Sequence, residues 1–281
     1  MTPGRYVAGL VGVIACTASL SAQWPSYPTP NVPRTADGRP NLLAPTPRTS
    51  DGRPDLSGIW ANPGWREIGA GTGVSGTGGA PGTPAVLPRG PGLFFDIGSG
   101  VPGGLPFQPW ASDLRKKRMA EGSKDNPDAH CLPMGNMQLV THPQPRKIIQ
   151  TPTIIVILYE GNAGIRQIFT DQRPLPANDP QPWWFGYSTA RWIGDTLVVD
   201  TSGFRDEGWL DVNGSPLTSA AKVTERFTRV NYGNLDIEIT VDDPKAYTRP
   251  WTVTVRNEIM LDTELIEFIC LENEKSTQHF R

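Results

Sequence analysis

The feature that most constrains the fold is a pair of alternating segments on either side of Gly194-Asp195. From residue 187 to 204 the chain reads YSTARWIGDTLVVDTSGF, and residues suited to β-strands flank the Gly-Asp dipeptide. This pattern indicates two strands joined by a tight turn, because glycine and aspartate accept the backbone angles of such turns. Similar segments lie before and after it, so we predict that the hairpin lies in the middle of a larger sheet.

Those segments continue through most of the second half of the chain. They cover residues 56–60, 147–150, 153–160, 165–170, 187–204, 222–230, 235–241, 251–260 and 264–272. The links between them are mostly short, which favours antiparallel neighbours. Segments such as 235–241 carry one apolar face, and a sheet of such strands must bury that face. We therefore predict an all-β fold in which an antiparallel meander closes into a calycin- or lipocalin-like β-barrel.

The first half of the chain is different in composition, because most of the 30 glycines and 29 prolines precede Pro145. Residues 23–55 are predicted to be an extended Pro-rich segment. It contains a repeat, PRTADGRPNL at 33–42 and PRTSDGRPDL at 47–56. Asp-Gly followed by Arg-Pro is turn chemistry, so each copy predicts the same turn. Residues 56–281 are predicted to be a single barrel domain with a Gly/Pro-rich insertion at about 64–104.

Two local elements are expected in this first half. Within the insertion, Leu93-Phe94-Phe95 is apolar enough to reach the core. A helix is predicted at 110–121, with Ser112 or Asp113 as its N-cap.

The N-terminus has the pattern of an export signal. Arg5 precedes an uncharged apolar run, residues 6–20, which is too short to span a membrane comfortably. Residues 1–22 are predicted to be a signal peptide cleaved after Ala22. The alternative is a lipoprotein signal with Cys16 acylated. Either way we expect a secreted or periplasmic protein without a transmembrane span.

Removal or lipidation of Cys16 leaves Cys131 and Cys270, and two thiols in an oxidising compartment favour a disulfide. A metal site would need more ligands, and the three histidines form no HxxxH or similar spacing. We therefore predict the disulfide and no metal or other cofactor. The net charge of −2 argues against a nucleic-acid partner.

No catalytic signature is present, so the candidate site rests on charges that share strand faces with apolar residues. Glu225, Glu267 and Asp200 are the candidate catalytic carboxylates. If their faces point inward, each needs a partner, because a buried unpaired charge costs several kcal/mol. If the faces point outward, the charges only solvate the barrel.

The choice of partner depends on strand alternation. Tyr187 and Arg191 share one face of their strand, and Trp192 lies on the other, so only one of these sets can point inward. We predict that Tyr187 and Arg191 do, because an arginine beside buried acids offsets the burial cost. Arg226 is the other arginine considered as a partner. The predicted ligand-binding residues are Tyr187, Arg191, Glu225, Glu267 and Trp184, the last from an aromatic-rich loop.

Several exact strings carry a family resemblance. They are DGRPDLSGIW at 51–60, WIGDTLVVDT at 192–201, TERF at 224–227 and DPKAYTRPW at 243–251. Across residues 51–274 the chain resembles a large family of secreted proteins of unknown function from environmental bacteria. The resemblance implies export and assigns no activity. Where relatives often carry histidine in DGRPHP and GHP strings, this chain has Leu175 and Ser215.

Three functions remain open from the sequence. The first is an exported barrel that binds a small, partly apolar or aromatic molecule in its interior. The second is a secreted hydrolase, lyase or isomerase that uses an interior carboxylate with an arginine or tyrosine partner. The third is a surface or assembly protein.

Overall fold

The computed structural model describes residues 27–63, 92–176 and 181–272. The predicted signal peptide, including Cys16, and most of the Gly/Pro-rich insertion lie outside these ranges. Among the described residues, no helix has both the length and the apolar composition needed to cross a membrane.

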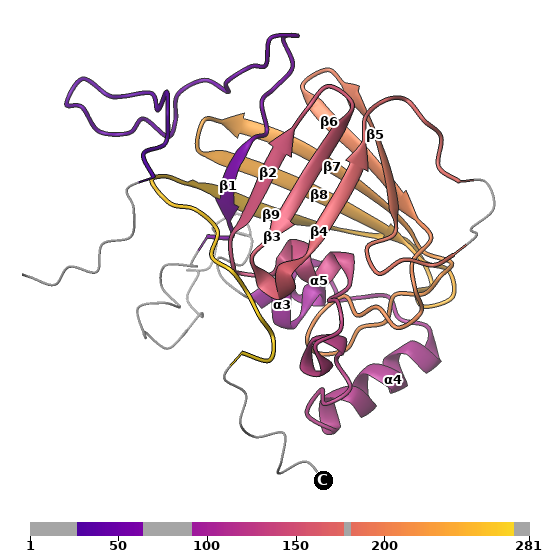
Figure 1. Ribbon diagram of the computed structural model, residues 1–281. Coiled ribbons are helices and arrows are strands. Elements are labelled where there is room, and N and C mark those ends of the chain that lie inside the picture. Colours follow the sequence, from indigo (N-terminus) through magenta and orange to yellow (C-terminus); the bar gives the residue numbers. More distant parts are fainter. Residues whose placement is uncertain (1–26, 64–91, 177–180, 273–281) are drawn as a thin grey trace, which may run out of the picture.

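Nine strands form one closed barrel, and their order around it is their order in the chain (Figure 1). This confirms the predicted all-β barrel. The strands are β1 (Gly58–Ala61), β2 (Arg146–Gln150), β3 (Ile154–Tyr159), β4 (Ile165–Phe169), β5 (Tyr187–Ile193), β6 (Thr196–Ser202), β7 (Lys222–Asn231), β8 (Asn234–Asp242) and β9 (Trp251–Met260). The predicted hairpin is β5–β6, with Gly194 at a φ of 58° in its turn.

Two details of the predicted meander are wrong. Strands β4 and β5 pair in parallel over only two residue pairs, Ile168–Ser188 and Phe169–Thr189. Residues 264–272 form no strand. The edge of β9 that a tenth strand would need is already paired with β1.

Strand alternation separates an apolar interior from a mixed outer wall. Across β6 to β9 the paired residues Val199, Glu225, Ile239 and Val253 lie in one row, and all four are buried. Full burial of each aliphatic side chain contributes about 1.5–3 kcal/mol, so the interior is the main source of stability. Glu225 is the exception in this row.

One end of the barrel, called here the plug end, is covered by short helical segments (Figure 1). These are α3 (Gly92–Phe95), η1 (Ile97–Gly100) and α5 (Asn136–Thr141). Leu93 is buried as predicted, whereas Phe95 is exposed. The packing is close, since a Cβ on Gly100 would lie 2.5 Å from Cγ2 of Val253 on β9. All six residues of α5 are buried, and the sequence analysis did not predict this helix.

The predicted helix at 110–121 is confirmed as α4 (Pro109–Ala120), which lies outside the barrel (Figure 1). Its N-cap is Gln108 and not Ser112 or Asp113. The reason is Pro109, which occupies the first helical turn, where its fixed φ and missing N–H cost nothing. Two further single turns are η2 (Pro127–His130) and η3 (Gly161–Ala163).

The two repeat copies form the same turn near the opposite end of the barrel. The Thr35 N–H donates to Arg39 O at 2.9 Å, and Thr49 N–H donates to Arg53 O at the same distance. Both copies contact the barrel, since the Leu42 carbonyl of the first accepts from the Gly233 N–H at 2.8 Å, but the second copy is buried more deeply. Its Leu56 is 0% exposed, whereas the equivalent Leu42 of the first copy is 39% exposed.

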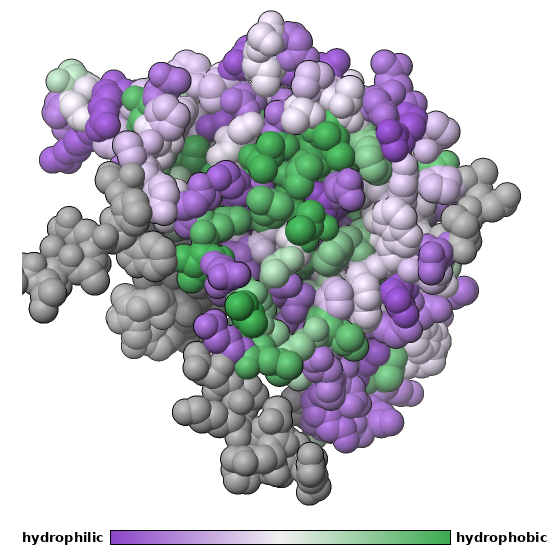
Figure 2. All heavy atoms as spheres, viewed as in Figure 1, coloured by the Kyte–Doolittle hydropathy of each residue, from purple (hydrophilic) through white to green (hydrophobic). Residues whose placement is uncertain are grey.

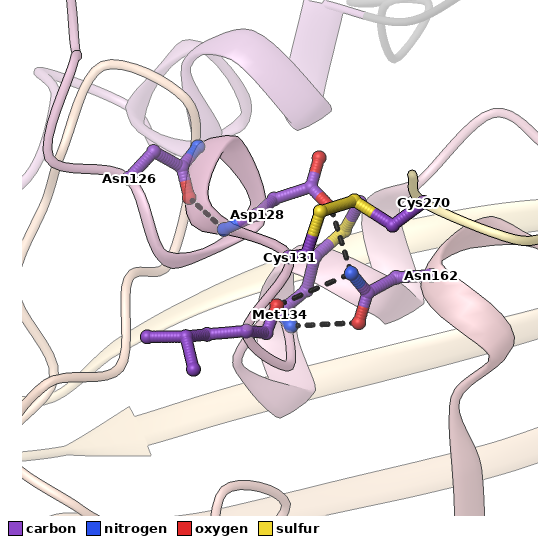
Figure 3. Close-up of a disulfide and its surroundings, with 7 residues drawn as sticks. Asn126, Asp128, Cys131, Met134, Asn162 and Cys270 are labelled. Carbon is purple, nitrogen blue, oxygen red and sulfur yellow. Dashed lines mark hydrogen bonds between the residues drawn. A yellow bond between two sulfur atoms is a disulfide. The ribbon is translucent and has the colours of Figure 1, made fainter. Parts of the chain in front are cut away.

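The predicted disulfide between Cys131 and Cys270 is present (Figure 3). Its sulfur atoms are 2.07 Å apart, and it joins the segment after β9 to the turn that follows η2. Asn162 organises the same region, because its side chain donates to Asp128 Oδ1 at 2.7 Å and accepts from Met134 N at 3.2 Å. The C-terminal segment is therefore fixed to the plug end.

The outer wall of the barrel has two characters. Figure 2 shows an apolar area over β2–β4, where Ile149 and Ile165 are 40% and 58% exposed. Over β7–β9 the outer residues are largely polar and include the ion pairs Arg226–Glu238 and Arg256–Asp236. The outer wall over β7–β9 is therefore a solvated surface, and the buried polar groups lie in the interior.

Candidate functional site: a buried polar cluster at the plug end

The centre of the site is an ion pair that crosses the barrel interior. Arg166 on β4 and Glu225 on β7 have side chains that are 1% and 0% exposed. Arg166 Nη1 donates to Glu225 Oε1 at 2.9 Å, and Nη2 donates to Oε2. Such bidentate pairs are strong and directional, so both carboxylate oxygens are fixed. Burial lowers the pKa of Arg166, but the attraction of Glu225 outweighs it and the net shift is upward.

Two hydroxyl groups complete the coordination of Arg166. Ser188 on β5 and Thr201 on β6 are a directly opposed pair, and their oxygens are 2.8 Å apart. Arg166 Nη2 donates to Ser188 Oγ at 3.2 Å and to Thr201 Oγ1 at 3.1 Å. The guanidinium therefore joins strands β4, β5, β6 and β7. This matters most at the β4–β5 seam, where the backbone pairing is short.

Tyr159 and Arg146 extend the cluster across β3 and β2. They are directly opposed in the strand register, and the Arg146 guanidinium carbon is 5.8 Å from the centre of the Tyr159 ring. Burial raises the pKa of the Tyr159 hydroxyl, and this outweighs the lowering by the Arg166 and Arg146 charges. Tyr159 is therefore a neutral phenol at neutral pH.

Arg146 is a buried cation held by neutral oxygens. Its Nη2 donates to Asn62 Oδ1 at 3.1 Å and to the His142 carbonyl at 2.7 Å, and Nη1 donates to the Val140 carbonyl. It makes no ion pair with any described residue. Burial lowers the pKa of Arg146 to about 10, so it stays charged at neutral pH. Two of its acceptors are carbonyls of α5 and its C-terminal boundary, namely those of Val140 in the last turn and His142 directly after it. Arg146 therefore also holds that helix in place.

His142 follows α5 and packs against Phe94. Burial, with a smaller contribution from the Arg146 charge, lowers the pKa of His142 to about 4. Its Nδ1 accepts from the Gln144 backbone N–H at 3.1 Å. His142 is therefore neutral at neutral pH, and one ring nitrogen is already occupied.

Several buried polar atoms at this end have no hydrogen-bond partner among the described residues. Three belong to inward-facing strand residues: Arg166 Nε, Arg146 Nε and Trp251 Nε1. Four more are the amide oxygens and nitrogens of Asn136 and Gln138 on α5, both 0% exposed. Each buried unpaired group costs about 1–3 kcal/mol, and native proteins contain only a few. Of the two other such atoms, Arg115 Nε lies on α4 and Asn257 Oδ1 towards the opposite end of β9.

The structure brings only one of the predicted site residues into this cluster. Glu225 faces inward as predicted, but its partner is Arg166 and not Arg191 or Arg226. Arg191 faces solvent and pairs with Asp200 on the outer wall. Tyr187 is also on the outer side and stacks on Phe169 at 5.3 Å. Trp192 is the residue that turns inward, because it lies opposite Leu197 of the core.

The other predicted residues lie elsewhere. Glu267 is exposed in the segment after β9, which forms no strand and so has no inner face. Trp184 is half-buried in the loop before β5, with the Arg205 guanidinium 5.0 Å from its ring. Asp200 lines a surface groove of about 410 Å³ that also includes Leu175. Ser215, the second position where relatives often carry histidine, is buried against Asp211.

Sequence reasoning missed Arg166, Arg146, Tyr159 and α5. A signal for the two arginines was present, because each lies two residues before an inward-facing isoleucine, Ile168 or Ile148. This is the same criterion that identified Glu225. Helix α5 gave no such signal, since all of its faces are buried and no amphipathic period exists.

No family model, curated protein or solved structure matches the chain. The functional argument therefore rests on the geometry of the site.

Proposed function

We propose that this protein is exported and binds a small, partly apolar or aromatic molecule inside its barrel. The observation that carries the proposal is the set of unpartnered donors and acceptors at the plug end. They belong to β2, β4, β9 and α5, and the barrel interior around the Arg166–Glu225 pair is otherwise mostly aliphatic and aromatic. A bound molecule that meets these groups would offset their burial cost.

The composition of the site suits a ligand with both apolar and polar parts. Small-molecule sites are mostly lined by apolar side chains, with a few placed polar groups that fix orientation. Here Ile157, Ile168 and Phe227 are among the apolar residues of the barrel interior. Most of the unpartnered polar atoms are at the plug end, whereas Asn257 Oδ1 lies towards the opposite end. This asymmetry favours a molecule whose polar group lies next to α5 and whose apolar part points along the barrel.

The same geometry favours binding over catalysis by Glu225. A general base needs an oxygen that can take a proton, and both Glu225 oxygens accept from Arg166. Ser188 and Thr201 are bonded to each other and to Arg166, and no histidine contacts either hydroxyl among the described residues. The hydrolase, lyase or isomerase hypothesis therefore has less support than binding.

Two observations support export. The N-terminal sequence has the pattern of a signal peptide, and the Cys131–Cys270 disulfide suits an oxidising compartment. Export and ligand binding are separate parts of the proposal and are tested separately. N-terminal sequencing of secreted protein should begin near Gln23, and a start at Cys16 with added lipid mass would indicate the lipoprotein form.

Native mass spectrometry of protein purified from the periplasm tests the binding. We expect a bound mass that disappears on denaturation. Gln138→Leu should lose this mass and melt at the same or a higher temperature, because it removes two unpaired amide atoms. Gln167→Leu, on the outer face of β4, is the matched control and should keep the mass. Identical native and denatured masses, with no thermal stabilisation by a small-molecule extract, would refute the proposal.

A further inference from the structure

We infer that the ligand of this site is a hydrophobic carboxylic acid, whose carboxylate lies beside Arg146 and Arg166 at the plug end. This rests on the proposed binding function and specifies its ligand class. The first argument is the balance of charge inside the barrel. The charged side chains on the inner faces of the described strands are Arg146, Arg166, Arg229 and Glu225. Three cations therefore face one anion.

Two of these cations, Arg146 and Arg229, have only neutral oxygens as partners among the described residues, and they lie at different ends of the barrel. Arg166 is neutralised by Glu225. Arg229 lies at the opposite end, where it donates to the carbonyls of Asp55 and Tyr232 and stacks on Trp60 at 4.9 Å. Among the inward-facing strand residues at the plug end, Arg146 is the charged side chain that has no ion-pair partner in the described part of the chain. A buried cation without a counter-ion is costly, so an anion there would be favourable.

The buried acids near this end, Glu160, Asp211 and Asp243, form no ion pair with Arg146 among the described residues, and Glu160 accepts from the Ile266 backbone N–H at 3.1 Å. Asp211 accepts from Ser215 and from the Ile97 backbone N–H. Asp243 accepts from Thr218 through both carboxylate oxygens. Both are occupied by neutral donors and neither forms an ion pair with Arg146.

The second argument is the kind of hydrogen-bonding groups that remain. Arg146 on β2 and Arg166 on β4 lie on either side of Tyr159 on β3, and both Nε–H groups are unpartnered. The neutral phenol of Tyr159, directly opposite Arg146, can donate as well. Donors dominate this end, and a carboxylate offers about four acceptor positions. A dianionic phosphate would overcompensate the single excess charge of Arg146.

The third argument is the rest of the wall. Beyond the cluster, inward-facing residues such as Ile157, Val199 and Phe227 are apolar. The inward-facing Arg229 and Asn257 lie at the opposite end, where Arg229 is already held by carbonyl groups. An aryl or alkyl carboxylate matches this division, because its acidic group meets the cations and its hydrocarbon part meets the apolar wall.

The test compares two probes of nearly equal shape, 1-naphthoate and 1-naphthamide, by calorimetric titration of the full chain at pH 7. We expect the acid to bind at least tenfold more tightly than the amide. Arg146→Met should remove this preference, while Arg146→Lys should keep part of it. Arg191→Met, which removes an outer arginine, is the control and should leave the preference unchanged.

A readout that needs no variant covers the case in which Arg146→Met fails to fold. The molecule released from wild-type protein on denaturation should ionise as an anion and accept a methyl ester. A neutral released molecule, or an amide that binds as tightly as the acid, would overturn the inference and leave the binding function standing. If neither probe binds and no molecule is released, the binding function itself fails.

Discussion

The barrel contains two arginine–carboxylate pairs that differ chiefly in their surroundings. The side chains of Arg166 and Glu225 are 1% and 0% exposed, whereas those of Arg191 and Asp200 are 59% and 30% exposed. The buried pair joins strands across the interior, and the exposed pair joins two neighbouring strands on the outer wall. Breaking a buried pair leaves one charge unpaired in the core, while an exposed pair is screened by water. Breaking the buried pair should therefore cost much more folding stability than breaking the exposed pair.

Removing the charge of Glu225 should give the largest effect. We expect Glu225→Gln to lower the free energy of unfolding by about 3–5 kcal/mol, because Arg166 then remains buried without its counter-ion. Urea denaturation followed by circular dichroism measures this. Glu238→Gln, on the outer face of β8, is the control and should change stability by less than about 0.5 kcal/mol. The double change Arg166→Met with Glu225→Leu should recover much of the loss, since it removes both charges. A single-variant effect below about 1 kcal/mol would contradict the buried ion pair.

Lowering the pH tests the buried polar cluster, because it contains the neutral His142. The folded protein holds this histidine neutral with a pKa of about 4, whereas the unfolded chain protonates it near 6.5. The unfolded state therefore binds more protons between these values, and stability falls as the pH is lowered from 6.5 to 4. The stability that depends on a neutral His142 is fully present above pH 6.5 and amounts to about 3 kcal/mol at most.

His142→Asn should flatten this part of the pH profile, because asparagine can still accept from the Gln144 N–H but does not titrate. The measurement is the difference in unfolding free energy between wild type and variant at pH 4 and pH 7. Equal pH dependence in the two proteins would show that His142 is not buried as a neutral ring.

The exposed pair should give a small and salt-dependent effect. We expect Arg191→Ala to cost less than about 1 kcal/mol, and this cost should vanish in 1 M salt, where the Debye length is about 3 Å. Thermal melts at low and high salt measure it. The destabilisation by Glu225→Gln should persist in high salt, because ions do not reach the interior. If the loss of stability in Arg191→Ala did not depend on salt, the Arg191–Asp200 pair would be more buried than the structure shows.

The two repeat copies should give the smallest difference in stability. Arg48 of the second copy makes a bidentate pair with Asp195 in the β5–β6 turn, at 2.9 and 2.6 Å. The equivalent Arg34 contacts only the Gly38 carbonyl among the described residues. We expect Arg48→Ala to lower stability by up to about 1 kcal/mol and Arg34→Ala to leave it unchanged. Equal effects in thermal melts would show that the two copies pack alike.

Much of the fold followed from local patterns. The Gly194-Asp195 hairpin, helix α4, the barrel and the Cys131–Cys270 disulfide were all predictable, because each depends on neighbouring residues or on simple counting. The parallel β4–β5 seam was not predictable, since the pattern of a strand does not specify the direction in which its neighbour runs.

The site was predictable only in part. Alternation showed that Glu225 needs a partner if it points inward, but it could not identify the partner on a distant strand. Arg191 is the predicted partner because an arginine offsets the burial cost of an acid, whereas the observed partner, Arg166, reaches Glu225 across the interior of the closed barrel. Such a contact depends on the three-dimensional closure of the sheet, which no strand pattern specifies.

The pairing of β1 with β9 has a consequence for how the protein folds. Ile59 lies opposite Met260, so the barrel cannot close until nearly all of the described chain is available. Contacts between residues so far apart in the sequence slow folding, because loop-closure entropy is lost before the contact forms. Until then, β9 and β2 each present an unpaired edge that invites aggregation. Closure by the four-residue β1 is thus the late step that most exposes the nascent protein to misassembly, and the step at which a folding helper would act to greatest effect.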